Sequence, residues 1–249
     1  EGTVLARYMG QVAIARITVP SENRLSEERY AALPANNFID ELAHSQFQRL
    51  GLFPSDLCTD SEFLRRASLD AIGRLPTTEE AKGVLDDKSS GKRNKLIDRL
   101  LTDPAYADHW ANKWADLVRP NPDRAGLKSV YILDQWLREA FRKNTSMDQF
   151  AREMITASGS THRFGPTVVY RDKRTPPELA KIFSQVFLGT RLECARCHNH
   201  PLDRWTQTDY HQFAAHFSRT RVRGGELVVV ERGEVRHPRT EKVMSPSPL

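Results

Sequence analysis

The residues Cys194-Ala195-Arg196-Cys197-His198 form the segment in which spacing most narrowly restricts the chemistry of this chain. Two cysteines separated by two residues and followed at once by histidine form the attachment pattern of c-type haem. In that pattern both thiols bind the porphyrin covalently, and the histidine becomes an axial ligand of the iron. The segment indicates one covalent haem c, with Cys194 and Cys197 in thioether bonds and His198 as the proximal ligand.

The same cysteines also fit the spacing of a zinc finger. His211 follows Cys197 after thirteen residues and His216 follows after four more, which gives C-x2-C, x13, H-x4-H. Both spacings fall within the window of Cys2His2 zinc sites. A zinc-stabilised interaction module is therefore an alternative to a haem domain.

The local sequence pattern favours haem over zinc. The run Pro176–Leu188 opens on prolines and is apolar at helical spacing, so we expect a helix that leads almost directly into the cysteines. Zinc fingers instead carry their cysteines on a β-hairpin and have bulky apolar residues at set positions between the metal ligands. In this chain the first of those positions is occupied by Pro201. On the next expected helix, residues 208–217, His211 and His216 lie roughly 140° apart at about 100° per residue, so they converge poorly on one ion.

Composition sets limits on the class of protein. Of the 249 residues 39% are hydrophobic and 28% charged, and no run approaches the roughly eighteen apolar residues of a membrane span. The net charge of +5 is mildly basic, and without a focused basic patch we expect no nucleic-acid partner. The third cysteine, Cys58, stands alone, which excludes a disulfide scaffold.

Both ends of the chain carry hairpin signals. Residues 1–20 alternate as strand, Met9-Gly10 turn and strand, and because a lone hairpin is marginal in water we expect it to belong to a preceding domain. Near the other end, Arg232-Gly233 lies between two β-rich runs and predicts a second hairpin. The expected organisation is a hairpin at 1–20, a linker at 21–36, a helical domain at 37–220, and a hairpin with a linker-like tail at 221–249.

Between the hairpins, apolar residues recur at helical spacing nearly throughout. Gly51 and Gly73 read as helix stops, Thr77 with Glu80 reads as a capping box, and residues 158–166 predict an irregular loop. The fold class is therefore mainly α, a multi-helix c-type haem domain with short β-hairpins at the N- and C-terminal ends. Helices are predicted at 37–50, 60–72, a short stretch from 77, 92–101, 104–118, 129–143, 146–157, 176–188 and 208–217.

The helical part, roughly residues 37–219, resembles the planctomycete cytochrome-c-like domain family (PSCyt type) of large exported proteins. The most specific match runs from Gln185-Val186-Phe187-Leu188-Gly189 through the cysteines to Tyr210. The resemblance implies covalent haem on Cys194 and Cys197, His198 as proximal ligand, and a periplasmic or cell-surface location, but no reaction. The hairpin at 1–20 resembles the closing strands of a bacterial Ig-like domain. Further matching blocks are Phe63-Leu64-Arg65-Arg66, Gly73-Arg74-Leu75-Pro76-Thr77, Lys95-Leu96-Ile97-Asp98-Arg99-Leu100-Leu101, Trp114-Ala115-Asp116-Leu117, Tyr131 to Phe150 and Ser158-Gly159-Ser160-Thr161.

The axial position opposite His198 decides what such a haem site does. A methionine or histidine there gives an electron carrier, whereas an open position admits oxygen, peroxide or another small ligand. We also expect Pro201 and Trp205 to bind the cofactor, although Trp205 is equally typical of a core residue. The candidates for the distal ligand are Met154, His109, His162, His211 and His216.

Three functions follow from these features. The first is a monohaem c-type cytochrome domain for electron transfer in a larger exported protein, whose partner is a redox protein or a neighbouring domain of the same polypeptide. The chain begins with no signal peptide, yet bacteria install haem c outside the cytoplasm, so we expect it to be part of such a protein. The alternatives are a haem enzyme of the peroxidase or oxidase type with an open distal site, and the zinc-stabilised module.

Overall fold

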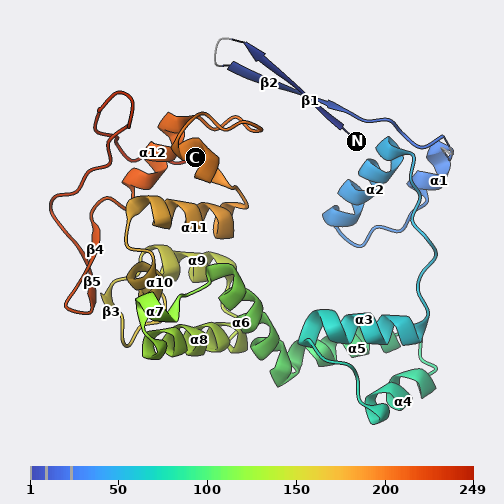
Figure 1. The fold of residues 1–249 in the computed structure, drawn as a ribbon. Helices are drawn as coiled ribbons and strands as arrows, with labels where there is room; N and C mark the ends of the chain where they lie inside the picture. Colours follow the sequence, from blue (N-terminus) through green and yellow to red (C-terminus); the bar gives the residue numbers. More distant parts are fainter. Residues whose placement is uncertain (1, 9–10, 23–24) are drawn as a thin grey trace. The chain divides into compact units, whose positions relative to one another are not determined.

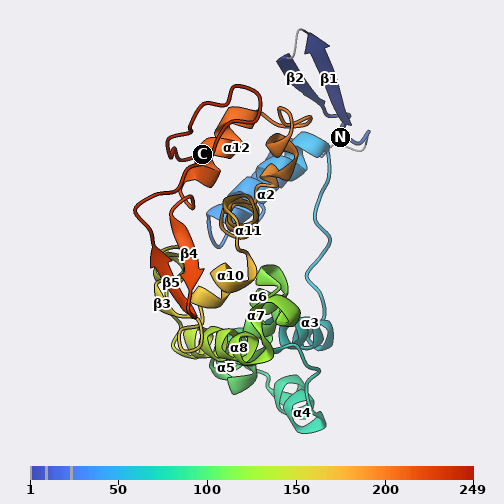
Figure 2. The same ribbon diagram turned by 60° about the vertical axis from the view of Figure 1, so that its left-hand side comes forward.

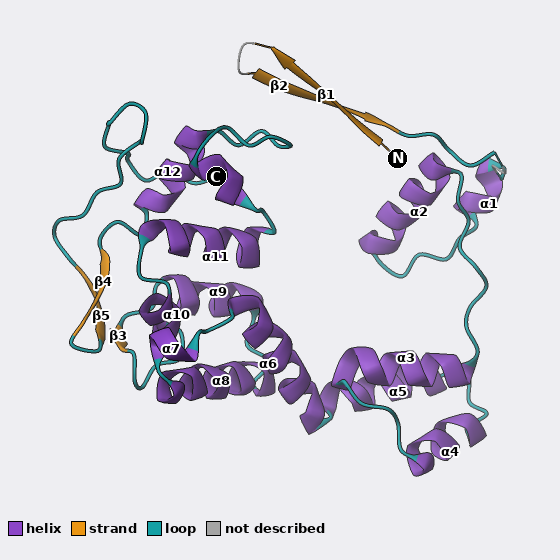
Figure 3. Cartoon of the chain, in the orientation of Figure 1, coloured by secondary structure: helices purple, strands orange, loops and turns teal. Residues whose placement is uncertain are grey.

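The computed structural model describes residues 2–8, 11–22 and 25–249. It divides the chain into two compact units, Glu1–Cys58 with Pro201–Asp203 and Thr59–His200 with Arg204–Leu249. The described residues contain twelve α-helices and short antiparallel hairpins near both ends, so the predicted mainly α class is confirmed (Figures 1 and 3). None of the described helices is both long and apolar enough to cross a membrane.

The first unit begins with the predicted hairpin. Strand β1 (Gly2–Tyr8) pairs antiparallel with β2 (Gln11–Ile17), with Gly2 opposite Ile17 and Tyr8 opposite Gln11. The predicted turn at Met9-Gly10 lies outside the described residues. The apolar side chains of this hairpin whose burial is described are exposed. Examples are Val4 at 53%, Tyr8 at 78% and Ile17 at 51%.

Two helices complete the first unit. Helix α1 (Glu27–Ala31), which the sequence pattern did not predict, buries Tyr30 against the ring of Phe53. Helix α2 (Phe38–Leu50) begins at Asn37, whose side chain accepts a hydrogen bond from the Ile39 backbone, and ends at Gly51 in the left-handed conformation. The predicted helix start and stop are therefore confirmed.

In the second unit, helices α3 (Asp60–Ile72), α4 (Thr78–Asp86) and α5 (Lys92–Thr102) share a small core. Helices α3 and α5 run side by side (Figures 1 and 3). The predicted stop at Gly73 and the capping box of Thr77 and Glu80 are both present. The buried residues of this core are Leu64, Ile72, Leu96 and Leu100.

The larger core of the second unit begins with α6 (Pro104–Val118), α7 (Pro122–Ala125), α8 (Leu127–Arg142), α9 (Met147–Ile155) and α10 (Thr167–Asp172). Its centre is aromatic, with the ring of Phe150 4.6 Å from that of Trp114 and 4.8 Å from that of Trp136, centroid to centroid. Helix α10 escaped prediction because five of its six residues are buried, so it has no polar face to set a helical period.

Helix α11 (Pro176–Leu188), the 3₁₀ helix η1 (Leu192–Arg196) and α12 (Gln207–Ala215) complete the helical core. Helix α11 lies between α12 and the group of α8, α9 and α10 (Figures 1 and 2). The rings of Phe183 on α11 and Phe217, just after α12, stack at 5.3 Å. This packing fixes the two helices that flank η1.

The C-terminal hairpin lies earlier in the chain than predicted. Strands β4 (Thr220–Arg223) and β5 (Glu226–Val229) meet at Gly224-Gly225, not at Arg232-Gly233. Both glycines have positive φ, +57° and +83°, which a tight two-residue hairpin turn requires and an arginine adopts at a cost. The segment 158–166, predicted to be irregular, contributes the short strand β3 (Gly159–Ser160), so the sheet order is β3-β5-β4.

Candidate functional site

The 3₁₀ helix η1 displays the cysteines because of its threefold spacing. Residues three apart lie on one face of such a helix. Leu192 and Ala195 point into the core, with exposed fractions of 1% and 0%, whereas Cys194 and Cys197 are exposed. The helical turn ends at Arg196, and Cys197 forms its C-terminal cap. Both thiols are therefore accessible on one side of an anchored turn.

His198 follows with one ring nitrogen occupied. Its Nδ1 lies 2.7 Å from the carbonyl oxygen of Asn199. Because a carbonyl can only accept, Nδ1 carries the hydrogen, and the Nε2 of the neutral ring keeps a lone pair. Histidines that bind metals usually have this arrangement, in which a hydrogen bond at one nitrogen orients the other. The exposed thiols and this lone pair fit the attachment of a haem.

Helix α12 holds η1 and the following residues in place through hydrogen bonds. The carbonyl of Arg196 accepts hydrogen bonds from Gln207 Nε2 at 3.0 Å and from His211 Nε2 at 3.2 Å. The Asn199 side chain accepts another from the Gln207 backbone at 3.0 Å. None of these hydrogen bonds involves a cysteine, so η1 is held in place without using either thiol.

A cavity of about 580 Å³ adjoins Cys197; we call it the Cys197 cavity. Its walls come from the start of α11, η1, α12 and residues 234–239. His211 lies in this wall with 7% of its surface exposed, and its Nδ1 is buried without a hydrogen-bond partner among the described residues. Burial lowers the pKa of His211 below its ordinary 6.5, although the hydrogen bond to the Arg196 carbonyl opposes the shift. The ring is therefore neutral near pH 7.

Of the five predicted distal candidates, only His211 shares this cavity with Cys197. Met154 is 1% exposed in the core, and His109 lies against Gly73 in the region of α3 and α6. His162 lies 3.0 Å from Arg171, and His216 lines a different cavity, of about 450 Å³, with Phe213 and Phe217.

The two other predicted cofactor residues, Trp205 and Pro201, belong to different units. Trp205 packs against the core with the guanidinium of Arg204 4.5 Å above its ring, and its buried indole nitrogen has no hydrogen-bond partner among the described residues. Its backbone oxygen accepts a hydrogen bond from His200 at 2.8 Å. Pro201 belongs to the segment Pro201–Asp203, which is part of the first unit, whereas Cys194 and Cys197 belong to the second.

The zinc alternative lacks a suitable ligand group. In the described part of the chain, no three His, Cys, Asp or Glu side chains gather closely enough to hold an ion. His211 and His216 line different cavities, as their predicted angular separation on α12 implies. The geometry therefore gives the zinc module no support.

His237 was not predicted from the sequence to belong to the site. It is 7% exposed, and its ring lies 5.7 Å from that of His211. Its Nδ1 accepts a hydrogen bond from the backbone of Arg239 at 3.3 Å. No local motif marks this residue, because its contact with His211 spans 26 positions and depends on how residues 235–249 fold back onto α12.

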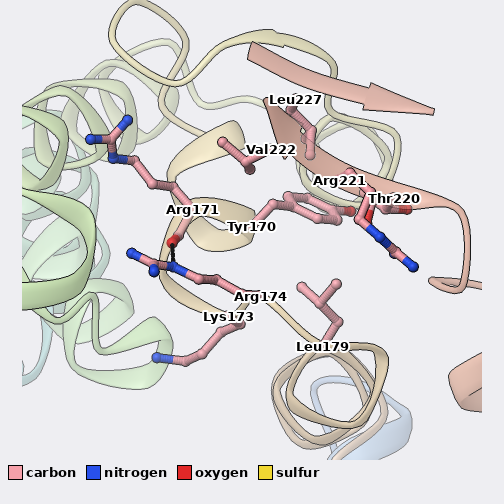
Figure 4. Close-up of a pocket in the computed structure, with 9 residues that line it drawn as sticks. All are labelled: Tyr170, Arg171, Lys173, Arg174, Leu179, Thr220, Arg221, Val222 and Leu227. Carbon is pink, nitrogen blue, oxygen red and sulfur yellow. Dashed lines mark hydrogen bonds between the residues drawn. The ribbon is translucent and has the colours of Figure 1, made fainter. Parts of the chain in front are cut away.

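A third cavity, of about 340 Å³, is lined by four cationic residues, each of which is hydrogen-bonded to a backbone oxygen. Figure 4 shows Arg171, Lys173 and Arg174 extending away from Tyr170. Their side chains donate to the backbone oxygens of Ala125 (2.6 Å), Arg119 (3.3 Å) and Arg171 (3.1 Å), respectively. The fourth, Arg221, donates to the Thr220 carbonyl at 2.8 Å. These cations stabilise the loops around α10.

A family model named PSCyt2, described as a protein of unknown function (DUF1549), matches residues 38–222, more than half of the chain. No curated protein matches the chain. No solved structure matches it. The matched range includes the cysteines and His211 and ends before Arg236 and Arg239.

Proposed function

The chain belongs to the PSCyt2 family, and we propose that it is a monohaem c-type cytochrome domain that transfers electrons within a larger exported protein. The family name points to a cytochrome-like domain, while its description assigns no function. The observation that carries the proposal is the arrangement of Cys194, Cys197 and His198. Two exposed thiols lie on one anchored turn, next to an imidazole whose Nε2 is available.

Each residue of this group has a distinct task. The thiols of Cys194 and Cys197 would hold the haem by thioether bonds to its two vinyl groups, with each S–H hydrogen passing to carbon so that no oxidant is needed. His198 donates the Nε2 lone pair to the iron, and the Asn199 carbonyl holds the ring in orientation through Nδ1. When bound, haem supplies one-electron chemistry to the domain.

Location and partners follow from the attachment chemistry. Bacteria attach haem c outside the cytoplasm, so we propose a periplasmic or cell-surface location. The exposed apolar side chains on β1 and β2 support the expectation that this hairpin completes a sheet of a preceding Ig-like domain. The electron partner is then a redox protein or a neighbouring domain of the same polypeptide.

The Cys197 cavity favours a second candidate, a haem enzyme with an open distal site. A buried histidine with an available nitrogen is the kind of group that activates a small ligand at such a site. If His211 instead binds the iron, the domain is a six-coordinate carrier. Reduced and oxidised optical spectra separate the two, because a carrier gives sharp low-spin bands and an open site gives a high-spin spectrum that changes on adding cyanide.

The direct test is covalent attachment. The chain is produced in the bacterial periplasm together with haem c maturation proteins, denatured, separated by electrophoresis and stained for haem. We expect a stained band for the unaltered chain and for the Cys58→Ser control, and none for the Cys194→Ser/Cys197→Ser double variant. A colourless chain without a Soret band, or stain that survives the double substitution, contradicts the proposal.

A further inference from the structure

The Cys197 cavity carries an excess of positive charge. Arg196, Arg236 and Arg239 line it, and Glu234 is its one acidic residue in the described part of the chain. Glu234 is already paired, because its carboxylate lies 2.6 Å from the guanidinium of Arg236. The guanidinium groups of Arg196 and Arg239 form no hydrogen bond or ion pair with any described residue. Two full donors therefore stand at one cavity without an acceptor.

The turn that carries Arg239 is held firmly against the cavity. The backbone of His237 donates to the Lys242 carbonyl at 2.9 Å and accepts from the Glu241 backbone at 2.9 Å, which closes residues 237–242 into a turn. The His237 side chain accepts from the Arg239 backbone, and the imidazole ring of His237 packs beside that of His211. Arg239 therefore projects from a defined backbone.

His211 adds a third group with a different role. Its Nε2 donates to the Arg196 carbonyl, so the Nδ1 of the neutral ring is an acceptor, and that atom is buried without a partner. Leaving a buried polar atom unpaired costs free energy. A ligand that brings a hydroxyl to this nitrogen removes that cost.

We propose that the Cys197 cavity binds a small oxyanion that keeps one hydroxyl group, as inorganic hydrogen phosphate does near neutral pH. Arg196 and Arg239 donate to the charged oxygens, and His211 Nδ1 accepts the hydrogen bond of the hydroxyl. The start of α11, at Pro176 and Pro177, adds the positive end of a helix dipole to the same wall. The proposal concerns the haem-free chain, because Cys197 and His211 also line the cavity next to the proposed haem attachment site.

The combination of two guanidinium donors and one imidazole acceptor predicts selectivity. Sulfate matches hydrogen phosphate in size and charge, but it has no hydroxyl near neutral pH. It therefore satisfies the arginines and leaves His211 Nδ1 unpaired. The cavity should prefer inorganic phosphate to sulfate, and this preference should depend on His211.

Isothermal titration calorimetry of the haem-free full chain tests this, with inorganic phosphate and sulfate at about pH 8 and constant ionic strength. We expect phosphate to bind about tenfold more tightly than sulfate, the factor of one unsatisfied hydrogen bond. Arg239→Gln should weaken both anions about tenfold, since it removes one charged donor. His211→Leu should remove the preference and leave sulfate binding within about threefold.

Arg223→Gln is the matched control, because Arg223 is an exposed arginine on β4 that does not line the Cys197 cavity. It should leave both affinities within about twofold. The proposal is overturned if the unaltered chain binds neither anion, binds both equally, or loses as much affinity with Arg223→Gln as with Arg239→Gln. Because Arg239 is exposed, its substitution leaves the fold intact even where His211→Leu disturbs packing. Covalent haem is measured separately, so either proposal can fail alone.

Discussion

Residues 73–80, which we call the α4 entry, and residues 192–198, the η1 segment, both concentrate polar groups but satisfy them differently. In the α4 entry, Arg74 donates to Glu80 at 2.9 Å and to Asp103 at 3.2 Å. Thr77 and Glu80 also bond to each other's backbone. In the η1 segment both thiols and the Nε2 of His198 are available, and the Arg196 guanidinium has no partner among the described residues.

This difference separates groups that stabilise the fold from groups that are accessible to a ligand. Polar groups that pair internally contribute to stability and lose it when one partner is removed. Exposed groups without internal partners contribute little to stability. Substitutions in the α4 entry should therefore change the unfolding free energy, and those in the η1 segment should leave it nearly unchanged.

Gly73→Ala should have the largest effect. Gly73 has φ of +70°, and a Cβ at this position would overlap the ring of His109. Left-handed strain and overpacking together should lower the unfolding free energy by about 2–4 kcal/mol, measured by chemical denaturation. Gly83→Ala is the control, since nothing lies within 4 Å of its added Cβ, and it should stabilise helix α4 by about 0.5–1 kcal/mol. Equal effects at both positions would contradict the close packing of Gly73 against His109.

The ion pair of the α4 entry should appear as a pH dependence. The Arg74 guanidinium lowers the pKa of Glu80 from 4.5 to about 2, so the carboxylate stabilises the fold above about pH 4.5 and loses this contribution as pH falls towards 2. Because the Arg74 side chain is 40% exposed, solvent screening reduces the loss to about 1–2 kcal/mol. The difference in unfolding free energy between the unaltered chain and Glu80→Gln should be smaller at about pH 3 than at about pH 6. The exposed neighbour Glu79→Gln should show no such convergence.

The sequence pattern predicted the longer helices but missed the short helices α1, α7 and α10. Gly51 and Gly73 favour helix ends because glycine adopts the left-handed conformation easily, and Thr77 with Glu80 favours a helix start because their side chains cap it. The structure confirms each of these predictions. The C-terminal hairpin was misplaced because a β-rich run with Arg232-Gly233 outweighed Gly224-Gly225, although only the latter pair meets the backbone demand at both positions.

The candidate site was only partly predictable for the same reason. The cysteines and His198 form a contiguous motif that spacing alone reveals, and this part of the site remains a prediction. The cavity beside them depends on residues 234–239 returning to α12, which no local pattern encodes. His237 and Arg239 therefore became visible only in three dimensions, whereas His211 was named from the sequence as one of five equivalent candidates.

Thr77→Ala should have a smaller effect than the two changes above. It removes the side-chain oxygen that accepts from the Glu80 backbone at 3.2 Å, but leaves the Glu80 carboxylate on the Thr77 backbone at 2.7 Å. Loss of one N-cap interaction should cost about 1 kcal/mol in unfolding free energy. Thr77→Ser keeps the hydroxyl and should cost clearly less. If both variants lose the same amount, the methyl group rather than the cap stabilises the entry to α4.

Cys194→Ser in the haem-free chain should have the smallest effect on stability. The thiol is exposed on η1, and the contacts that hold η1 come from Leu192, Ala195 and the Arg196 carbonyl, none of which the substitution alters. The unfolding free energy should therefore change by less than about 0.5 kcal/mol. Leu192→Ala, on the buried face of the same turn, should cost about 2–5 kcal/mol and shows that the measurement is sensitive there. A loss above about 1 kcal/mol for Cys194→Ser would mean that this thiol supports the fold, and the contrast between the two segments would fail.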